Sequence, residues 1–356
     1  MDTGSHRRLN LLTGDWVLVS EGRTKRPWQG AVREDGSTRK RVLARDPDCY
    51  LCPGAKRATG EVNPDYEAVF VFDNDFSALT TGSSSGSSIA SGSMLRAEPE
   101  SGLCRVICFS PRHDLTLARM QTAHIEKIVD AWIVQTRDLL SMPEIRSVQI
   151  FENKGALMGC SNPHPHGQIW AQSSVPSHLA REVARQADHY RRDGTALLDV
   201  YLDEERGRRE RLVIGNRHFV ALVPFWATWP FETLVLPKDA VSKLADLDSA
   251  QRRSLADILR RLTVRYDNLF QTDFPYSAGI HQAPDDADHD AYFRLHMHFY
   301  PPLLRSATVQ KFMVGYELLG EAQRDISPER AAELLRRQSE VHYTIAQARE
   351  AQGQVS

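Results

Sequence analysis

The chain has 356 residues, a length that predicts two domains of ordinary size. Its 44 basic and 46 acidic residues give a net charge of −2, so nothing in the charge suggests a basic nucleic-acid-binding tail or a membrane-binding patch. No apolar run approaches membrane-spanning length, and residues 1–10 are polar and basic, unlike a signal peptide. Five cysteines are too few, and odd in number, for a disulfide framework, so we expect a reducing compartment, by default the cytoplasm.

The N-terminal quarter contains a strand pattern, a cysteine pair and a polar loop. Alternating apolar residues predict a strand over 15–20, and a basic loop with Arg23 and Arg26 follows. Cys49 and Cys52 form the sole C-x-x-C motif, which excludes a four-cysteine zinc site and leaves a redox motif or a zinc site completed by histidines. Residues 81–93 are almost all glycine and serine and predict a mobile surface loop.

The stretch 160–170, CSNPHPHGQIW, is the most informative part of the sequence. In an extended strand alternate side chains share a face, so His164, His166 and Gln168 are expected to line one surface. The Gly/Ser/Asn residues just before them offer exposed backbone amides, the usual means of holding a phosphate. A single histidine in such a turn would suggest a structural role, whereas three polar groups beside a phosphate-type loop predict a functional site.

The remaining elements follow the same order in both halves of the chain. Each half has strands, a long amphipathic helix and then a strand with an H-x-H pair, which indicates an internal duplication. Asp248 and Gln251 match a capping box at the start of the second long helix. The expected strands are 105–109, 148–151, 218–223, 233–236 and 295–300; the expected helices are 118–140, 177–191 after an N-cap at Ser177, one from 248, and 327–348.

The histidines suggest two kinds of chemistry. A neutral imidazole is a competent nucleophile near neutral pH, so a histidine beside a phosphate-holding loop indicates attack on phosphorus. His296 and His298, with His281 and Glu182, form a His/carboxylate set suited to a divalent metal. A hydrogen-bonded core histidine is the alternative for each member of that set.

Several motifs closely resemble the galactose-1-phosphate uridylyltransferase family, a branch of the histidine-triad superfamily. They are NKG at 153–155, GCSNPHPHGQ at 159–168, RLHMHFYPP at 294–302 and KFMVGYE at 311–317. The resemblance runs from Arg23 to about Gln323, nearly the whole chain. It implies an α+β fold in which two histidine-triad-like domains, 1–195 and 196–356, each form an antiparallel half-barrel with helices packed on the sheet.

The resemblance also implies an activity, the transfer of UMP from UDP-glucose to galactose 1-phosphate in the Leloir pathway, through a uridylyl-histidine. It implies that His166 is the nucleophile and that Gln168 and Ser161 assist it. The implied substrate-binding residues are Arg23, Arg26, Asn74, Asp75, Asn153, Gly159, Cys160, Ser161, Gln168, Lys311, Phe312, Tyr316, Glu317 and Gln323. In the family the last five complete the sugar-phosphate pocket from the other subunit of a homodimer.

The metal sites implied by the resemblance are both complete in this sequence. Cys49, Cys52, His113 and His164 match the ligands of a structural zinc, and Glu182, His281, His296 and His298 match those of iron or a second zinc. Two other functions stay open at this point: a histidine-triad nucleotidyltransferase, phosphorylase or hydrolase of different specificity, and a non-catalytic metal- or nucleotide-binding protein. Gln168 discriminates against the hydrolases, which carry a third histidine at that place.

Overall fold

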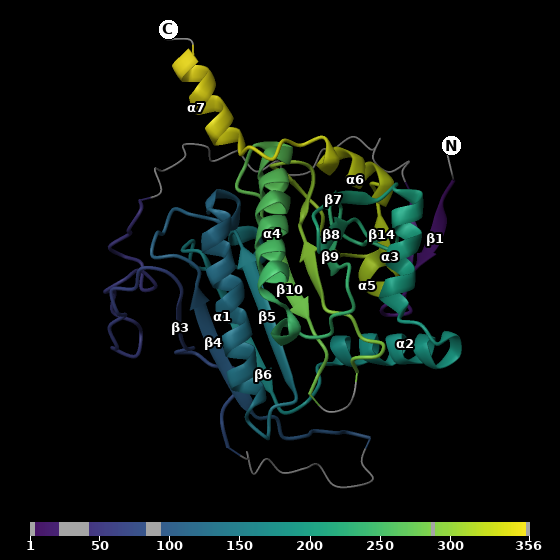
Figure 1. Ribbon diagram of the computed structural model, residues 1–356, viewed down its shortest axis with the longest axis horizontal. Coiled ribbons are helices and arrows are strands. Elements are labelled where there is room, and N and C mark those ends of the chain that lie inside the picture. Colours follow the sequence, from purple (N-terminus) through teal and green to yellow (C-terminus); the bar gives the residue numbers. More distant parts are fainter. Residues whose placement is uncertain (1–3, 21–42, 83–93, 286–288, 354–356) are drawn as a thin grey trace.

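The computed structural model describes residues 4–20, 43–82, 94–285 and 289–353 (Figure 1). Arg23, Arg26 and most of the Gly/Ser-rich segment lie outside these described residues. Within them, no helix combines the length and the apolar character needed to cross a bilayer.

A nine-stranded sheet with antiparallel neighbours forms the centre of the molecule. Its strand order is β3-β4-β6-β5-β10-β11-β9-β8-β7. The strands are β3 Phe70–Asp73, β4 Gly102–Cys108, β5 Ser147–Lys154, β6 His166–Gln172, β7 Leu212–Gly215, β8 Phe219–Leu222, β9 Thr233–Pro237, β10 Tyr276–His281 and β11 His296–Tyr300. This antiparallel sheet with packed helices confirms the expected α+β class.

The sheet has the same order on each side of the β5–β10 junction. Moving outward from that junction, β5, β6 and β4 follow on one side and β10, β11 and β9 on the other. In each half a long helix connects the third strand from the junction to the strand at the junction. Helix α1, Thr122–Leu140, follows β4 and precedes β5, and helix α4, Ser249–Phe270, follows β9 and precedes β10. This repetition supports the internal duplication that the sequence predicts, and it makes β6 and β11 equivalent strands.

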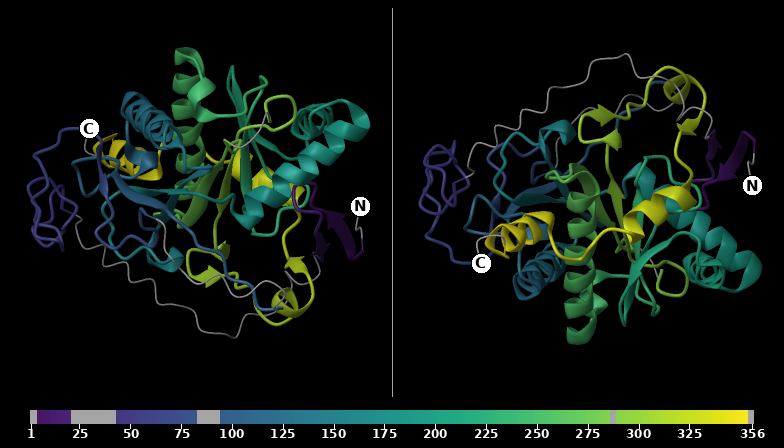
Figure 2. Two further views of the ribbon diagram at one scale, coloured as in Figure 1. Left: turned by 90° about the horizontal axis from the view of Figure 1, so that it is seen from below. Right: turned by 90° about the horizontal axis from the view of Figure 1, so that it is seen from above.

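Helices α1 and α4 lie side by side across one face of the sheet (Figures 1 and 2). Their apolar residues recur at helical spacing, as the sequence predicts, and they are buried against the sheet: Ile125, Ile128, Val129 and Trp132 of α1, and Leu255, Ile258, Leu259 and Leu262 of α4. The capping box at the start of α4 is present, with Asp248 accepting from the Gln251 amide and Gln251 accepting from the Asp248 amide. The opposite face of the sheet is therefore left for other contacts.

Smaller elements surround this body. A second sheet, β1-β2-β14, joins the two ends of the chain, since β2 pairs in parallel with β14. The strands are β1 His6–Leu9, β2 Trp16–Val19, β12 Leu303–Ser306, β13 Val309–Gln310 and β14 Ala322–Arg324; the helices are α2 Ser177–Asp193, α3 Leu197–Arg208, α5 Tyr316–Leu319, α6 Pro328–Arg336 and α7 Tyr343–Gly353; 3-10 turns span Leu117–Arg119, Ala156–Met158 and Leu244–Asp246.

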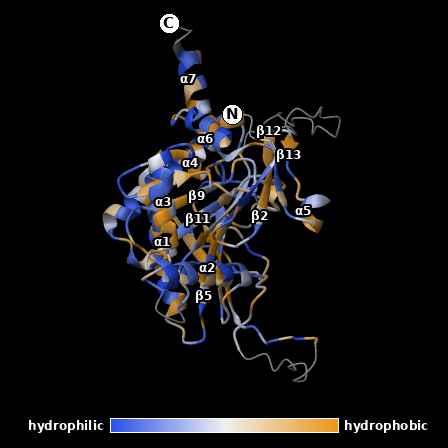
Figure 3. Cartoon of the chain, turned by 90° about the vertical axis from the view of Figure 1, so that its right-hand side faces the viewer, coloured by the Kyte–Doolittle hydropathy of each residue, from blue (hydrophilic) through white to orange (hydrophobic). Residues whose placement is uncertain are grey.

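Three expected helix boundaries are wrong. The helix expected from 118 begins at Thr122, after the separate 3-10 turn Leu117–Arg119. Pro176, not Ser177, is the N-cap of α2, and Ser177 is the first helical residue. The final helix is interrupted between α6 and α7, and α7 projects from the body (Figures 1 and 3). The interruption has a tertiary cause, because Arg265 of α4 donates from Nη1 to the carbonyl oxygens of residues 335, 336 and 338. Those carbonyls are thereby satisfied without a continuing helix.

Candidate functional site

His166 is the first residue of β6, and it faces away from α1 and α4. Along β6, Gly167, Ile169 and Ala171 are buried, while His166, Gln168 and Trp170 are partly exposed on the other face. Gly167 has no room for a side chain, since a β-carbon there would lie 2.8 Å from the carbonyl oxygen of Phe151. The strand therefore presents His166 and Gln168 side by side on the open face.

The His166 ring is held by its own backbone surroundings. Nδ1 lies 2.7 Å from the carbonyl oxygen of His164. A carbonyl oxygen only accepts, so Nδ1 carries the proton and Nε2 keeps its lone pair. Burial lowers the pKa of His166, although the hydrogen bond to the His164 carbonyl opposes the shift. The ring is thus a neutral imidazole whose lone pair lies on Nε2.

The side chain of His166 lines two adjoining cavities. The larger has a volume of about 490 Å³, and the smaller, of about 50 Å³, lies against the loop before β6. His166, Gln168 and Ser161 line both. The larger is also lined by Tyr50, Leu51, Lys56, Arg57, Ala58, Phe72, Asn74, Asp75, Phe76 and Val106, and the smaller by Phe151, Asn153, Gly159, Cys160 and Gly167. The predicted residues from Asn74 to Gln168 therefore gather around His166.

The loop that closes the smaller cavity needs two glycines. Gly155 and Gly159 have φ values of 88° and 76°, in the left-handed region that glycine adopts without strain. Between them lies the 3-10 turn Ala156–Met158, and the Gly159 amide donates to the Ala156 carbonyl. The chain is thereby folded back so that Gly159, Cys160 and Ser161 approach His166, as expected for a loop that holds a phosphate.

The larger cavity contains a buried ion pair that the sequence did not reveal. Arg57 Nη1 lies 2.8 Å from Asp75 Oδ1, and both side chains are less than a tenth exposed. The guanidinium also stacks over the ring of Phe72, 4.2 Å from its centroid. Arg57 thus fixes one oxygen of Asp75 and leaves the other for a polar ligand. An arginine five residues after a C-x-x-C pair carries no sequence signal for such a role.

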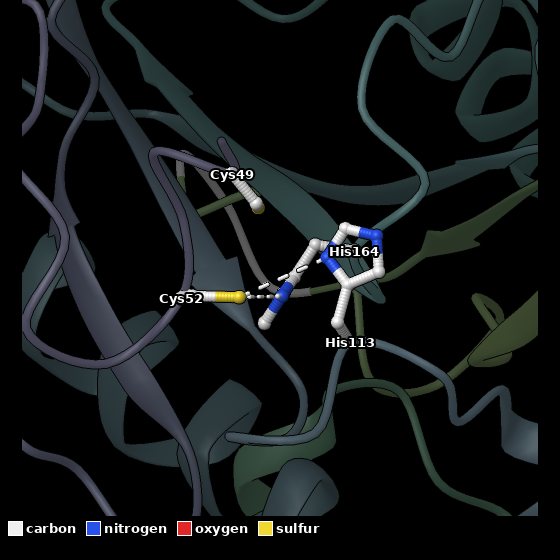
Figure 4. A group of neighbouring side chains, drawn as sticks. All are labelled: Cys49, Cys52, His113 and His164. Atoms are coloured by element: carbon white, nitrogen blue, oxygen red, sulfur yellow. Dashed lines mark hydrogen bonds between the residues drawn. The ribbon is translucent and has the colours of Figure 1, made fainter. Parts of the chain in front are cut away.

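Cys49, Cys52, His113 and His164 form a buried cluster beside this site (Figure 4). Their ligand atoms all lie within 4.8 Å of one another. Cys52 Sγ is 3.8 Å from His113 Nδ1 and 3.6 Å from His164 Nδ1. A tetrahedral zinc ion with ordinary bond lengths separates its sulfur and nitrogen ligands by about 3.6 Å, so the cluster fits that ion.

The surroundings of the cluster fit a metal as well. His164 Nε2 donates to the Ser110 carbonyl oxygen at 2.9 Å, which leaves Nδ1 as the lone-pair nitrogen facing Cys52. Burial raises the pKa of Cys52 to about 11, and only a bound cation would favour its thiolate there. His164 precedes β6 and turns its ring into this cluster, so it does not share the cavity with His166 and Gln168 as the strand pattern predicted.

Glu182, His281, His296 and His298 form a second cluster, in which α2 meets β10 and β11. Glu182 Oε2 lies 2.7 Å from His281 Nδ1 and 3.1 Å from His296 Nε2. His296 Nδ1 lies 2.7 Å from the Arg294 carbonyl oxygen, so its Nε2 has the free lone pair. His296 begins β11 and His166 begins β6, and each ring is held by the carbonyl two residues earlier.

A metal fits the second cluster because one of its rings is otherwise unsatisfied. Both ring nitrogens of His298 are buried without a hydrogen-bond partner among the described residues. Burial lowers the pKa of His298 to about 4, so the ring is neutral and available as a ligand. Burial raises the pKa of Glu182, but His281 and the other two histidines lower it by a larger amount. The net pKa lies well below that of an ordinary glutamate, so the carboxylate is ionised.

The expected sugar-phosphate residues form a group of their own. Lys311 Nζ lies 2.6 Å from Glu317 Oε1 and 3.4 Å from Gln323 Oε1, while Phe312 and Tyr316 are 61% and 51% exposed. None of them is among the residues that line the two cavities at His166. Figure 3 shows the α5 region standing out from the body, beside β12 and β13.

Tyr66 and Trp170 contact two of the predicted site residues, and sequence analysis did not identify either of them. Tyr66 donates to the Leu51 carbonyl and lies 3.0 Å from His164 Nε2, so it packs behind the cysteine and histidine cluster. Trp170 donates to Gln168 and packs against Phe151. Trp170 follows Gln168 at the same two-residue spacing as His166 precedes it, and that alternation was a signal that could have found it.

Comparison with known families agrees with this geometry. The models for the N-terminal and C-terminal domains of galactose-1-phosphate uridyl transferase match residues 1–176 and 181–347. The galactose-1-phosphate uridylyltransferase of Haemophilus influenzae is 52% identical over 338 residues, covering 95% of each chain. That of Rattus norvegicus is 49% identical over 345 residues, covering 96% of this chain and 90% of its own.

Solved structures give the same architecture. A uridylyltransferase structure superposes with a TM-score of 0.72 at 26% identity, over 93% of this chain and 97% of the other. An ADP-glucose phosphorylase from Arabidopsis thaliana reaches 0.73 at 22% identity, over 94% and 100%, a likeness of fold alone.

Proposed function

The chain belongs to the galactose-1-phosphate uridylyltransferase family, and we propose that it transfers UMP from UDP-glucose to galactose 1-phosphate. The observation that carries the proposal is the neutral His166 ring, whose Nε2 is free beside the cavities that Gln168 and Ser161 line. The near-complete match to relatives of that name supports the choice of substrates. It places the reaction in galactose metabolism, the Leloir pathway.

The reaction proceeds in two displacements at one phosphorus atom. In the first, His166 Nε2 forms a bond to the α-phosphorus of UDP-glucose as the bond to the bridging oxygen breaks, and glucose 1-phosphate leaves. In the second, a phosphate oxygen of galactose 1-phosphate attacks the same phosphorus, and the N–P bond breaks to release UDP-galactose and the free imidazole. The proton stays on Nδ1 throughout and is donated in a hydrogen bond to the His164 carbonyl oxygen, which stabilises the positive charge on the modified ring.

The surrounding residues divide into three groups. Gln168 and Ser161 serve the reacting phosphoryl group, together with Asn153, Gly159 and Cys160 in the smaller cavity. Asn74 and Asp75 take the nucleoside side, where the larger cavity is lined by apolar and aromatic residues. We also assign Arg23 and Arg26, by family resemblance, to the binding of the UDP-sugar.

The pocket for the sugar phosphate is completed by residues from a second copy of the chain. Lys311, Phe312, Tyr316, Glu317 and Gln323 lie apart from the cavities at His166. Two of them, Phe312 and Tyr316, are exposed aromatic residues, the kind of side chain that a partner subunit buries. A homodimer with shared sites therefore accounts for their separation from the nucleophile.

The two clusters would hold metal ions with structural roles. The Cys/Cys/His/His set suits zinc in a closed tetrahedral site, and the Glu/His/His/His set suits iron or a second zinc. When bound, each ion supplies rigid attachment between segments far apart in sequence. The repeated strand order further supports division into two histidine-triad-like domains, 1–195 and 196–356. A cytoplasmic location stays a prediction, supported by five cysteines that are all free.

Intact-mass spectrometry after incubation with UDP-glucose alone tests the function. The wild-type chain is expected to gain one UMP, and His166→Gly is expected to gain none while it still folds. Subsequent addition of galactose 1-phosphate should remove the label and give UDP-galactose. Intersecting initial-rate lines with no labelled enzyme would rule out the covalent route.

A hydrolase or phosphorylase of the same superfamily is the second candidate. It is not favoured, because a glutamine stands at position 168 and because the relatives matched over nearly the full chain are uridylyltransferases. Release of UMP from UDP-glucose at the same rate with and without galactose 1-phosphate would reverse this preference.

A further inference from the structure

The side chains of Gln168 and Trp170 are joined by a hydrogen bond along β6. Trp170 Nε1 lies 2.9 Å from Gln168 Oε1. An indole nitrogen only donates, so the amide atom that it meets must be the carbonyl oxygen. This fixes the orientation of an amide whose oxygen and nitrogen are nearly identical in shape. The amide nitrogen of Gln168 is then the atom left for another partner, and none of the described residues provides one.

The indole itself is held in place. Trp170 packs edge-to-face against Phe151 of the neighbouring strand β5, with ring centroids 5.7 Å apart and planes at 71°. Phe151 is also the cross-strand partner of Gln168. The three side chains therefore form one unit on the open face of the sheet, and the indole N–H cannot turn away from the amide without losing its contact with Phe151.

We propose that Trp170 is a positioning residue that keeps the Gln168 amide turned so that its NH₂ group donates to the phosphoryl oxygens. This inference rests on the proposed function and deepens it. A phosphoryl group bound to His166 has only acceptor oxygens, which attract the amide nitrogen and repel the amide oxygen. Without the indole donor, the amide is free to rotate and present either atom.

The consequence concerns the competition between sugar phosphate and water. A uridylyl-histidine has to survive until galactose 1-phosphate binds, although water is present at far higher concentration. Amide donors on the phosphoryl oxygens hold that group in one orientation, and a rotating amide does not. Loss of the Trp170 donor should therefore increase the share of uridylyl-enzyme that is hydrolysed by water. Its effect on the affinity for UDP-glucose should be smaller.

The test variant is Trp170→Phe, which keeps an aromatic ring against Phe151 and removes the donor. Trp132→Phe is its matched control, because the Nε1 atom of Trp132 is buried without a hydrogen-bond partner among the described residues. Isolated uridylyl-enzyme is followed in buffer, with and without galactose 1-phosphate. We expect the hydrolysis-to-transfer ratio to rise about three- to tenfold in Trp170→Phe, the equivalent of one neutral hydrogen bond. It should stay within about twofold of wild type in Trp132→Phe.

A spectroscopic measurement reports on the same contact without relying on activity. The chain has six tryptophans, so ¹⁵N-tryptophan labelling gives at most six indole N–H signals, and the signal missing in Trp170→Phe belongs to Trp170. We expect that signal to be protected from exchange with water and to move when UDP-glucose uridylylates the enzyme, while the Trp132 signal stays in place.

The outcomes separate this inference from the proposed function. A wild-type chain that gains no UMP would overturn the function and, with it, the role assigned to Trp170. A wild type that reacts normally, together with an unchanged hydrolysis ratio in Trp170→Phe, would overturn the inference alone. So would a Trp170 indole signal that exchanges freely with water. A Trp170→Phe variant that fails to fold still leaves the wild-type exchange measurement, which decides whether the hydrogen bond exists.

Discussion

The Nδ1 atom of His166 donates to the carbonyl oxygen of His164 over 2.7 Å, and the ring of His164 lies in the Cys49, Cys52 and His113 cluster. The carbonyl group that orients the His166 ring thus belongs to a residue of the cysteine and histidine cluster. A displacement of that site would move the carbonyl, and the orientation of the His166 ring would change with it. The cluster can therefore affect catalysis without contacting the substrate.

Cys52→Ser should remove zinc from the first cluster. A serine oxygen is a poor replacement for a thiolate, so we expect the loss of about one zinc per chain and a lower melting temperature, with reduced turnover because His166 is less well held. Metal analysis and thermal unfolding provide the measurements. Cys104→Ser is the control, since Cys104 is equally buried and lies outside the cluster. If Cys52→Ser kept its metal and the wild type formed a reversible disulfide, the redox alternative would be correct.

Glu182→Ala should reduce stability more than turnover. The change leaves two buried histidines, His296 and His298, and the half-buried His281 without their carboxylate, which costs about 3–5 kcal/mol in the free energy of unfolding. Because the cluster lies at α2, β10 and β11 and none of its residues lines the two cavities at His166, kcat is expected to fall much less. Urea unfolding and steady-state kinetics on the same preparation measure both effects. A large fall in kcat at unchanged stability would assign the cluster a direct part in the reaction.

Gln168→His should convert stored uridylyl-enzyme into UMP. A glutamine amide donates hydrogen bonds but exchanges no proton near neutral pH, whereas an imidazole can help to activate water. We expect the isolated intermediate to form poorly or to decay at least about tenfold faster in buffer than the wild type. Its half-life is measured with and without galactose 1-phosphate. A wild-type intermediate that decays equally fast in both conditions would contradict the role given to Gln168.

Glu329 should make stability depend on pH in the acid range. Burial raises its pKa, but hydrogen bonds from Arg8 and Arg211 lower it more, to about 2. Because the folded pKa lies below the unfolded one, the stabilisation is complete above pH of about 4.5 and is lost as the pH falls toward 2. Glu329→Gln should thus lower the free energy of unfolding by about 2 kcal/mol at pH 7, allowing for partial exposure, and by progressively less below pH 4.

Urea unfolding at several pH values tests this prediction, with Glu333→Gln as the control on the same helix. Glu333 pairs with Arg330 and Arg337 at the surface, where solvent screens the interaction. Its substitution should have little effect at any pH. A difference between wild type and Glu329→Gln that stayed constant from pH 7 to pH 3 would show that the carboxylate charge does not contribute.

The sequence by itself determined the local elements and the chemical identity of the site. The helical spacing of Ile125, Ile128 and Trp132 and the capping pair Asp248 and Gln251 are local patterns, and each appears in the structure as expected. The histidine motifs were specific enough to indicate the family. Local patterns are readable because their energetics depend on neighbours three or four residues away.

Only the tertiary structure decided how distant segments meet. It brought Arg57 to Asp75, turned the His164 ring away from the face of His166 and Gln168, and interrupted the last helix where Arg265 satisfies its carbonyls. It also joined Trp170 to Gln168 and placed Phe151 against the indole. These outcomes depend on which polar groups find partners once the chain is packed, and partners from remote segments compensate for the cost of burying such groups. The order of residues along the chain contains no measure of those distances, so they could not be predicted from it.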